Sequence, residues 1–337
     1  GRVRHPITRD AARRNARRVG FVDAVYGPRR YFFGELFWSD DTGAPRNFGT
    51  SVDRHGGHVA RWLVTRDGFD LLFLYLYETD AAQHRGGDVL AAVEQADRSV
   101  GLLVEAAGGW NEFLERYAIV VVADHSQSAI EHAVDAQEPF EGLTLFRSSR
   151  HSDPAQCDLA IAASNRVAMA YLLPGGRLTA SEVGHRFARH PSADVVAWRE
   201  GAWFAVRREG GELRFRRGHD QHDLRGNGWE LAGDRDLLDP HVYPNALERI
   251  EGAVACATAG DVIVSARLGD EFADAGGQHH AGGGSHGSLR AEDSLVPLIT
   301  AGFEAPTGLG AQPSITDLTP LALRHFAGVT EQAGAII

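Results

Sequence analysis

The sequence predicts an α/β protein with a largely parallel central sheet and helices on both faces. Three apolar runs indicate strands of that sheet: residues 118–123 (AIVVVA), 70–77 (DLLFLYLY) and 261–266 (DVIVSA). The first run contains three consecutive valines and is too short for a typical helix, so it is typical of a strand covered on both faces. A helical pattern separates two of the runs, and a strand–helix–strand unit of this length places its two strands parallel.

Length and composition limit the class of protein. The 337 residues can bury a large core, and 45 acidic against 34 basic residues give a formal charge of −11. This balance argues against nucleic acid as the main partner, because binding a polyanion requires clustered basic charge. No apolar run approaches the ~18 residues that span a membrane, so we expect no membrane partner. Cys157 and Cys256 fit no metal or redox spacing and are expected to be buried, and we expect a cytoplasmic protein.

The first part of the chain offers few clear elements. It starts at Gly1 with no Met or targeting segment, so we expect it to begin partway through a larger protein. Four arginines at helical spacing favour a solvated helix face over an anion-binding patch: Arg13, Arg14, Arg17 and Arg18. The aromatic cluster of residues 26–38 is interpreted as a packed wall rather than a cofactor site, and residues 59–65 fit a short helix.

A helix is predicted after Gly87, between the strands at 70–77 and 118–123. Its apolar residues keep to one helical stripe: Val89, Leu90, Val93, Val100, Leu103 and Val104. Gly108 and Gly109 end it. Because the two flanking strands should be parallel, Asp80 and Asp124, which follow them, should emerge at the same edge of the sheet.

The rest of the chain supplies further elements. A strand is expected at 166–173, and residues 178–240 are interpreted as an inserted β-rich subdomain with antiparallel strands. The expected elements of this insertion are a helix at 180–189 and strands at 194–198, 203–207 and 212–216. The main sheet resumes with a helix at 244–255 and the strand at 261–266, and a final helix, capped by Thr316 and Asp317, runs to Phe326.

Carboxylates and imidazoles gather after three of the expected strands. They are Asp80 and His84, Asp124 and His125, and His286, which lies in the glycine-rich stretch 276–287 (GGQHHAGGGSHG). Glycines let the backbone approach a bound group closely, although such a stretch also occurs as flexible low complexity. Asp and His ligands without cysteine pairs suit Zn²⁺ or Mn²⁺ in a catalytic site, and two such ions can clamp a phosphoryl displacement. His219 and His222 have no partner at metal spacing and are interpreted as exposed.

These residues carry a resemblance to the alkaline phosphatase superfamily, in its branch of type I phosphodiesterases and nucleotide pyrophosphatases. The matching motifs are Asp80 with His84, Ala123-Asp124-His125-Ser126 and Gly284-Ser285-His286-Gly287. Ser126 replaces the usual Gly, and Glu78-Thr79 stands where a Pro is common. The resemblance implies an alkaline-phosphatase-like domain over residues 1–337, interrupted by the insertion at 178–240.

The resemblance also implies residue roles. Asp80, His84 and His286 would hold one divalent ion, and Asp124 and His125 a second. The ligand types above favour Zn²⁺ or Mn²⁺. His279 and His280 are candidates for contacts with the phosphoryl oxygens, with a structural role near the site as the alternative. The family's second ion also takes an Asp and a Thr or Ser nucleophile. Neither is found before residue 70, so we expect the nucleophile upstream of Gly1 and the domain to be incomplete at its N-terminus.

The expected function is a two-metal hydrolase of phosphate esters that acts through a phospho-enzyme. Its substrate would be a small anionic phosphodiester or nucleotide pyrophosphate, or a monoester. Alternatives within the superfamily are a phosphomutase, a sulfatase and a phosphonate hydrolase. A non-catalytic metal-binding relative is the alternative of a different class, and a Rossmann-type nucleotide binder is disfavoured because no G-x-G-x-x-G turn follows the opening strands.

Overall fold

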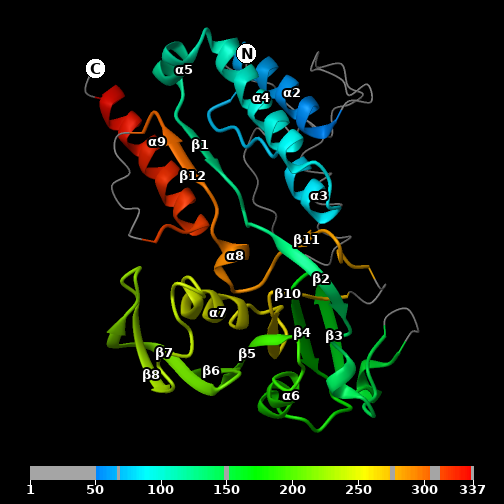
Figure 1. Ribbon diagram of the computed structural model, residues 1–337. Coiled ribbons are helices and arrows are strands. Elements are labelled where there is room, and N and C mark those ends of the chain that lie inside the picture. The colour runs from blue at the N-terminus through cyan, green and yellow to red at the C-terminus, as the bar shows by residue number, and fades with distance from the viewer. Residues whose placement is uncertain (1–50, 67–68, 148–151, 274–277, 304–311, 335–337) are drawn as a thin grey trace. The chain divides into compact units, whose positions relative to one another are not determined.

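The computed structural model describes residues 51–66, 69–147, 152–273, 278–303 and 312–334 (Figure 1). The arginine face and the aromatic cluster expected before residue 51 lie outside these ranges. The chain divides into two compact units, which are described separately. Unit 1 comprises Gly1–Ala82 and Asp88–Ala118, and unit 2 comprises Gln83–Gly87 and Ile119–Ile337.

Unit 1 is helical in its described part. It contains α2 (Val52–Val64), α4 (Val89–Ala107), α5 (Trp110–Arg116) and the first residues of α3 (Glu78–His84). The prediction of α4 is confirmed, and the helix ends at Gly108, whose φ of 109° suits a glycine cap. Helix α2 packs closely on α4, since a Cβ atom added at Gly57 would lie 2.9 Å from the Cβ atom of Ser99.

The prediction of a strand at residues 70–77 is wrong. This segment is extended, but it joins no sheet among the residues that the structure describes. Its side chains alternate in exposure, and Phe73 is 87% exposed. The end of the segment is held by Asp53 of α2, whose carboxylate accepts hydrogen bonds from the backbone N–H groups of Tyr77 and Glu78. The continuous apolar run of residues 70–77 therefore predicted a non-helical segment correctly, but not its pairing in a sheet.

The main sheet of unit 2 has seven strands in the order β3-β4-β9-β5-β6-β7-β8. Their bounds are β3 (Leu159–Ser164), β4 (Val167–Leu172), β5 (Ala193–Glu200), β6 (Trp203–Arg208), β7 (Gly211–His222), β8 (Gly228–Gly233) and β9 (Val262–Ala266). Every neighbouring pair is antiparallel, so the prediction of a largely parallel sheet is wrong. The cause is local, because tight turns such as the one at Gly201, where φ is 62°, reverse the chain between consecutive strands.

Helices cover both faces of this sheet (Figure 1). Alternate residues of β5 point to opposite faces. Trp198 belongs to the core under α6 (Ala180–Phe187), with Phe187. Ala197 belongs to the core under α7 (Ala246–Val254), with Ile250. The α/β character and the two helical layers therefore agree with the sequence prediction, whereas the strand directions do not.

The strands expected within residues 178–240 are present as β5, β6 and β7, and β8 adds a fourth. They continue the same sheet as β9 and β4. The division into one incomplete domain with an inserted subdomain stays a prediction.

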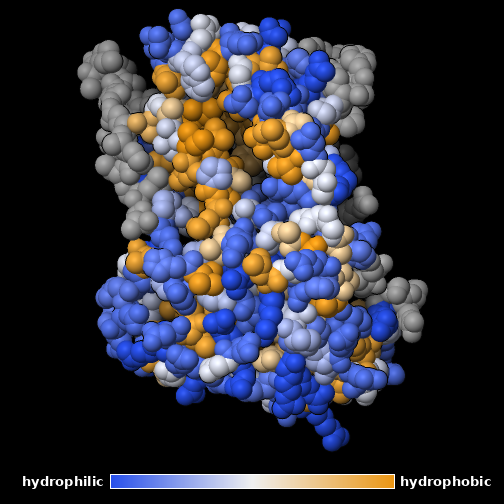
Figure 2. Space-filling view, viewed as in Figure 1, coloured by the Kyte–Doolittle hydropathy of each residue, from blue (hydrophilic) through white to orange (hydrophobic). Residues whose placement is uncertain are grey.

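Two smaller sheets complete unit 2. Strand β2 (Ser128–Val134) pairs in parallel with β10 (Gly269–Phe272) and antiparallel with β11 (Gly284–Ser285). Strand β1 (Ile119–Val122) pairs antiparallel with β12 (Leu298–Ala301). Figure 2 shows hydrophobic residues at the surface over these last two strands, where Val121 and Ile299 are exposed.

The C-terminal helix is α9 (Leu318–Gly334), preceded by a 3₁₀ turn at Ile315–Asp317. The capping residues of this turn are Ser314 and Asp317, rather than the predicted Thr316 and Asp317. Cys157 is buried as predicted, but Cys256 is exposed, so that prediction is wrong. In the part of the chain that the structure describes, no helix has both the length and the apolar character needed to cross a membrane.

Candidate metal centre

Helix α3 carries the first two candidate ligands. Asp80 and His84 are four residues apart, so they lie on the same face of the helix, about one turn from each other. The helix is continuous from Glu78 to His84, so its geometry sets the separation of Asp80 and His84. Asp53 holds the N–H groups at the start of α3, and burial raises the pKa of its carboxyl group.

His286 joins this pair. Asp80, His84 and His286 each offer one ligand atom, and these atoms all lie within 4.8 Å of one another. All three side chains are half-buried. Within the described ranges, no second group of three such residues has this spacing. The structure thus gathers residues that are more than 200 positions apart in the sequence.

The ring of His84 is oriented by the backbone of the glycine-rich loop. Its Nδ1 atom lies 2.9 Å from the carbonyl oxygen of Gly284. A carbonyl oxygen only accepts hydrogen bonds, so Nδ1 carries the proton and Nε2 carries the lone pair that a metal ion needs. The close approach of the glycine-rich loop to His84 depends on Gly283, because a Cβ atom at that position would clash with the carbonyl oxygen of His84. The glycines of this loop therefore permit the contact between two distant parts of the chain.

Ring spacings separate the histidines into two sets. The ring centroids of His84 and His286 are 5.1 Å apart. With Zn–N bonds of about 2.0–2.1 Å, two imidazoles on one tetrahedral ion have centroids roughly 5 Å apart, so this pair fits a shared ion. His125 stacks on His286 at 3.5 Å and 12°. Lone pairs in two nearly parallel ring planes do not converge, so His125 suits a different ion from His286.

Asp124 and His125 follow β1 and form a looser pair. The Asp124 side chain is 60% exposed, and its Oδ2 atom lies 3.6 Å from Nε2 of His125. Nδ1 of His125 lies 3.2 Å from the carbonyl oxygen of Ser126. His125 thus lies beside the three-residue group. Among the described residues, Asp124 and His125 belong to no group of three side chains spaced to hold a metal ion.

The loop that carries His286 is pinned by a buried ion pair. Arg166 and Asp293 are fully buried, and their charged groups are 2.6 Å apart. The backbone N–H of Arg166 donates to the carbonyl oxygen of His286 at 2.9 Å. The side-chain amide of Asn165 lies 3.2 Å from Nε2 of His286. Sequence reasoning missed Asn165, Arg166 and Asp293, although a polar Asn-Arg pair between two apolar strand patterns is a turn signal.

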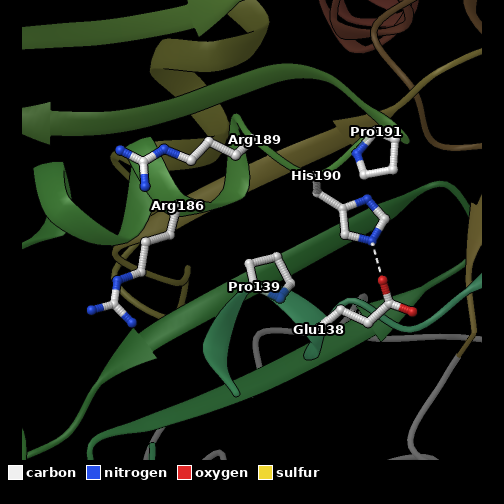
Figure 3. A pocket seen from close by; sticks show the side chains of 6 residues that line it. All are labelled: Glu138, Pro139, Arg186, Arg189, His190 and Pro191. Atoms are coloured by element: carbon white, nitrogen blue, oxygen red, sulfur yellow. Dashed lines mark ion pairs between the residues drawn. The ribbon is translucent and has the colours of Figure 1, made fainter. Parts of the chain in front are cut away.

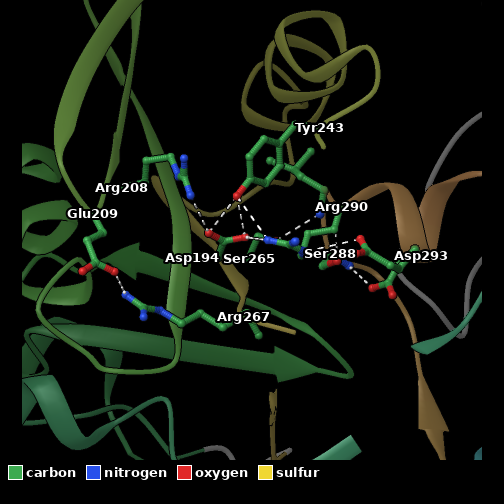
Figure 4. Close-up of polar contacts among 12 residues, drawn as sticks. Asp194, Arg208, Glu209, Tyr243, Ser265, Arg267, Ser288, Arg290 and Asp293 are labelled. Carbon is green, nitrogen blue, oxygen red and sulfur yellow. Dashed lines mark hydrogen bonds and ion pairs between the residues drawn. The ribbon is translucent and has the colours of Figure 1, made fainter. Parts of the chain in front are cut away.

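A second polar cluster holds the same loop further along (Figure 4). Arg290 lies 3.2 Å from the carboxylate of Asp194, which also accepts a hydrogen bond from the hydroxyl of Tyr243. Burial, with the nearby Asp194 charge, raises the pKa of Tyr243 to about 12, so the phenol stays protonated and donates. Leu289 donates its N–H to Ser265 Oγ at 3.0 Å. The segment from His286 to Asp293 is therefore fixed at several points.

The remaining candidate histidines differ in their surroundings. His279 is exposed, whereas His280 is half-buried and its ring centroid lies 4.0 Å from that of His84. His219 and His222 are exposed, as expected.

A surface pocket of about 460 Å³ shares no residue with this centre (Figure 3). It is lined by Glu138, Pro139, Arg186, Arg189, His190 and Pro191. His190 is buried, and its Nε2 atom lies 3.5 Å from the Glu138 carboxylate. Two arginines and one paired carboxylate do not form a metal site.

The profile of a family described as type I phosphodiesterase / nucleotide pyrophosphatase matches residues 23–289. No curated protein gives a significant match. Two crystal structures of phosphonoacetate hydrolase from Sinorhizobium meliloti 1021, one with phosphonoformate and one with phosphonoacetate, are similar at 16% identity, with TM-scores of 0.48 and 0.46. Each alignment covers 81% of this chain and 55% of the hydrolase, so the chain spans about half the length of these relatives.

Proposed function

The chain belongs to the type I phosphodiesterase / nucleotide pyrophosphatase family, and on that basis we propose that it is a two-metal-dependent hydrolase of phosphate esters. The substrate we propose is a small anionic phosphodiester or nucleotide pyrophosphate. The observation that carries the proposal is the meeting of Asp80, His84 and His286 around one point. A family profile alone supports the class of reaction, and this geometry adds a place where it can occur.

The donor set fits a divalent cation. One carboxylate and two imidazoles are ligands that Zn²⁺ and Mn²⁺ accept, and three protein ligands leave a position for substrate. A bound ion would supply Lewis-acid stabilisation of the charge that develops on the phosphoryl oxygens. Asp80 would balance part of the ion's charge, and the carbonyl oxygen of Gly284 would keep His84 in the tautomer that binds.

Asp124 and His125 are proposed to hold the second ion. The place of His125 beside His286 supports this role. Its ring is stacked nearly parallel to the His286 ring, so the lone pairs of the two rings do not converge on one ion, and His125 can bind a second ion. The reaction also requires a nucleophile. A Thr or Ser hydroxyl would serve, acting through a phospho-enzyme.

A second candidate function is a metal-binding protein without turnover. The observation that favours it is the Asp124–His125 pair, which has no third ligand in such a group among the residues that the structure describes. Such a protein would bind one ion at Asp80, His84 and His286 and leave phosphate esters intact.

One experiment separates these candidates. The full-length protein is stripped with a chelator and reloaded with Zn²⁺ or Mn²⁺, and bound metal is measured together with hydrolysis of bis(4-nitrophenyl) phosphate and 4-nitrophenyl phosphate. The hydrolase proposal predicts metal-dependent turnover that is lost in His84→Ala. It also predicts retained turnover in the matched control His132→Ala, whose side chain is 69% exposed. Bound metal without turnover supports the second candidate, and protein that neither binds metal nor hydrolyses either ester contradicts both.

A further inference from the structure

Two adjacent carboxylates of β10 each face a histidine, but in different environments. Asp270 lies 3.2 Å from Nδ1 of His132, whose side chain is 69% exposed, while the Asp270 side chain is 18% exposed. Glu271 lies 3.0 Å from Nδ1 of His280, and the Glu271 side chain is only 1% exposed. Neighbouring residues of a strand point to opposite sides, so Asp270 points toward the exposed His132 and Glu271 points into the interior.

Glu271 is bound to His280 in two ways. One carboxylate oxygen accepts the backbone N–H of His280, and the other faces its Nδ1 atom. A buried carboxylate requires such partners, because leaving one unpaired is costly. The two contacts fix both the backbone and the ring of His280, although the residue lies in a glycine-rich stretch.

His280 in turn packs against His84. Their ring centroids are 4.0 Å apart with an interplanar angle of 35°. This spacing is closer than the roughly 5 Å of two imidazoles on one tetrahedral ion, so it describes ring packing rather than a shared ion. His84 is therefore held by His280 against its ring and by the Gly284 carbonyl at Nδ1.

We propose that Glu271 is a positioning residue of the metal centre, acting through His280. It anchors His280 to β10, and the His280 ring keeps His84 in the orientation in which it meets Asp80 and His286. The inference rests on the proposed function to the extent that these three residues bind an ion. Strand β10 suits the task, because its pairing with β2, in which Glu271 lies opposite Ala133, fixes the position of the carboxylate.

The test is the metal affinity of variants, measured by competition with a chromophoric chelator. Residues that orient metal-binding histidines typically contribute 10–100-fold to affinity, so we expect Glu271→Ala to bind Zn²⁺ about 10-fold more weakly. Glu271→Gln keeps an acceptor for His280 and should lose less. The matched control is Asp270→Asn, which removes the neighbouring carboxylate and should bind Zn²⁺ as the wild type does.

A double-mutant cycle distinguishes positioning from a general effect on the fold. If Glu271 acts through His280, Glu271→Ala/His280→Ala should bind Zn²⁺ no more weakly than His280→Ala, because residues in one chain of contacts are not additive. The absorption spectrum of bound Co²⁺ should change in Glu271→Ala and not in Asp270→Asn. If thermal unfolding shows that the alanine variants are unfolded, Glu271→Gln/His280→Gln replaces them, with weaker binding again expected.

The inference would be overturned if Glu271→Ala bound Zn²⁺ with wild-type affinity. Where the alanine variants do not fold, wild-type affinity in Glu271→Gln/His280→Gln would overturn it. Additive losses of affinity in the double-mutant cycle would also overturn it. Failure of the wild-type protein to bind any divalent ion would instead contradict the proposed function, so the two failures are distinguishable.

Discussion

The two halves of the candidate centre are built differently. Asp80, His84 and His286 form a half-buried group whose ligand atoms lie within 4.8 Å of one another. Asp124 and His125 are neighbours in sequence, and the Asp124 side chain is 60% exposed. The first group is braced by backbone contacts, a buried ion pair and the Glu271–His280 contact. In the second pair, His125 lies against the carbonyl oxygen of Ser126 and the ring of His286.

This difference indicates which contacts make a metal centre rigid. Position after a strand brings Asp124 and His125 near the site, where the Asp124 side chain remains mostly exposed. The first group is organised by contacts between chain segments that are far apart in sequence, such as His84 with Gly284. We therefore expect the first group to bind an ion more tightly than the second pair does.

The largest expected effect comes from the buried ion pair behind His286. Removing one partner of such a pair costs about 3–5 kcal/mol, so Arg166→Met should lower the free energy of unfolding by about that amount. Denaturant titration measures it. The control is Arg98→Ala, which removes an exposed ion pair with Glu94 and should change stability by less than about 1 kcal/mol. Equal effects of the two variants would mean that the loop is not held as described.

Removal of a ligand should distinguish the two halves directly. We expect His84→Ala to weaken the tighter ion by about 100-fold or more, since even orienting contacts contribute 10–100-fold. Asp124→Ala should leave that ion's affinity near the wild-type value. Isothermal titration calorimetry with Zn²⁺ measures both. A similar loss of the tighter ion in both variants would remove the distinction between the two halves.

A substitution in the glycine-rich loop tests the close approach of the two segments. Gly283→Ala introduces a methyl group against the carbonyl oxygen of His84, and we expect a loss of about 1–3 kcal/mol in stability together with weaker metal binding. Gly101→Ala is the matched control, because nothing lies within 4 Å of a Cβ atom there and α4 should be slightly stabilised. Unchanged metal affinity in Gly283→Ala would show that the contact does not serve the centre.

The smallest effect concerns acid pH at a place remote from the ligands. The side-chain hydrogen bond from Arg225 lowers the pKa of Asp317 below its usual 3.8. A lowered pKa contributes stability above the unfolded-state value, and this contribution is lost as pH falls through the folded-state value. We expect Arg225→Ala to reduce stability by about 1 kcal/mol or less at pH 7, with the difference from wild type shrinking below pH 3.8. Thermal unfolding at a series of pH values measures it, and a difference that grows on acidification would contradict the assignment.

The sequence predicted part of the fold well. The helical stripe before Gly108 and the apolar runs at 166–173 and 261–266 are local signals, and α4, β4 and β9 are present. Strand direction and pairing were not predictable in this way. The segment 70–77 has the right pattern for a strand but no ladder partner in the described ranges, and tight turns make the main sheet antiparallel.

The candidate ligands were found from their residue types and motif, even though the reason given for their convergence was wrong. Asp80 emerges on a helix rather than at a parallel strand end, and His286 follows the short strand β11. The pairing of the supporting residues carries no local signal. Arg166 and Asp293 are 127 positions apart, and nothing in the sequence marks Glu271 as the partner of His280.

The most direct test of the account is anomalous diffraction from crystals of the protein grown with Zn²⁺. We expect a strong anomalous peak coordinated by Asp80, His84 and His286 and a weaker peak beside Asp124 and His125. Zinc found only at exposed histidines such as His132 or His219, with no density between the first three residues, would contradict it.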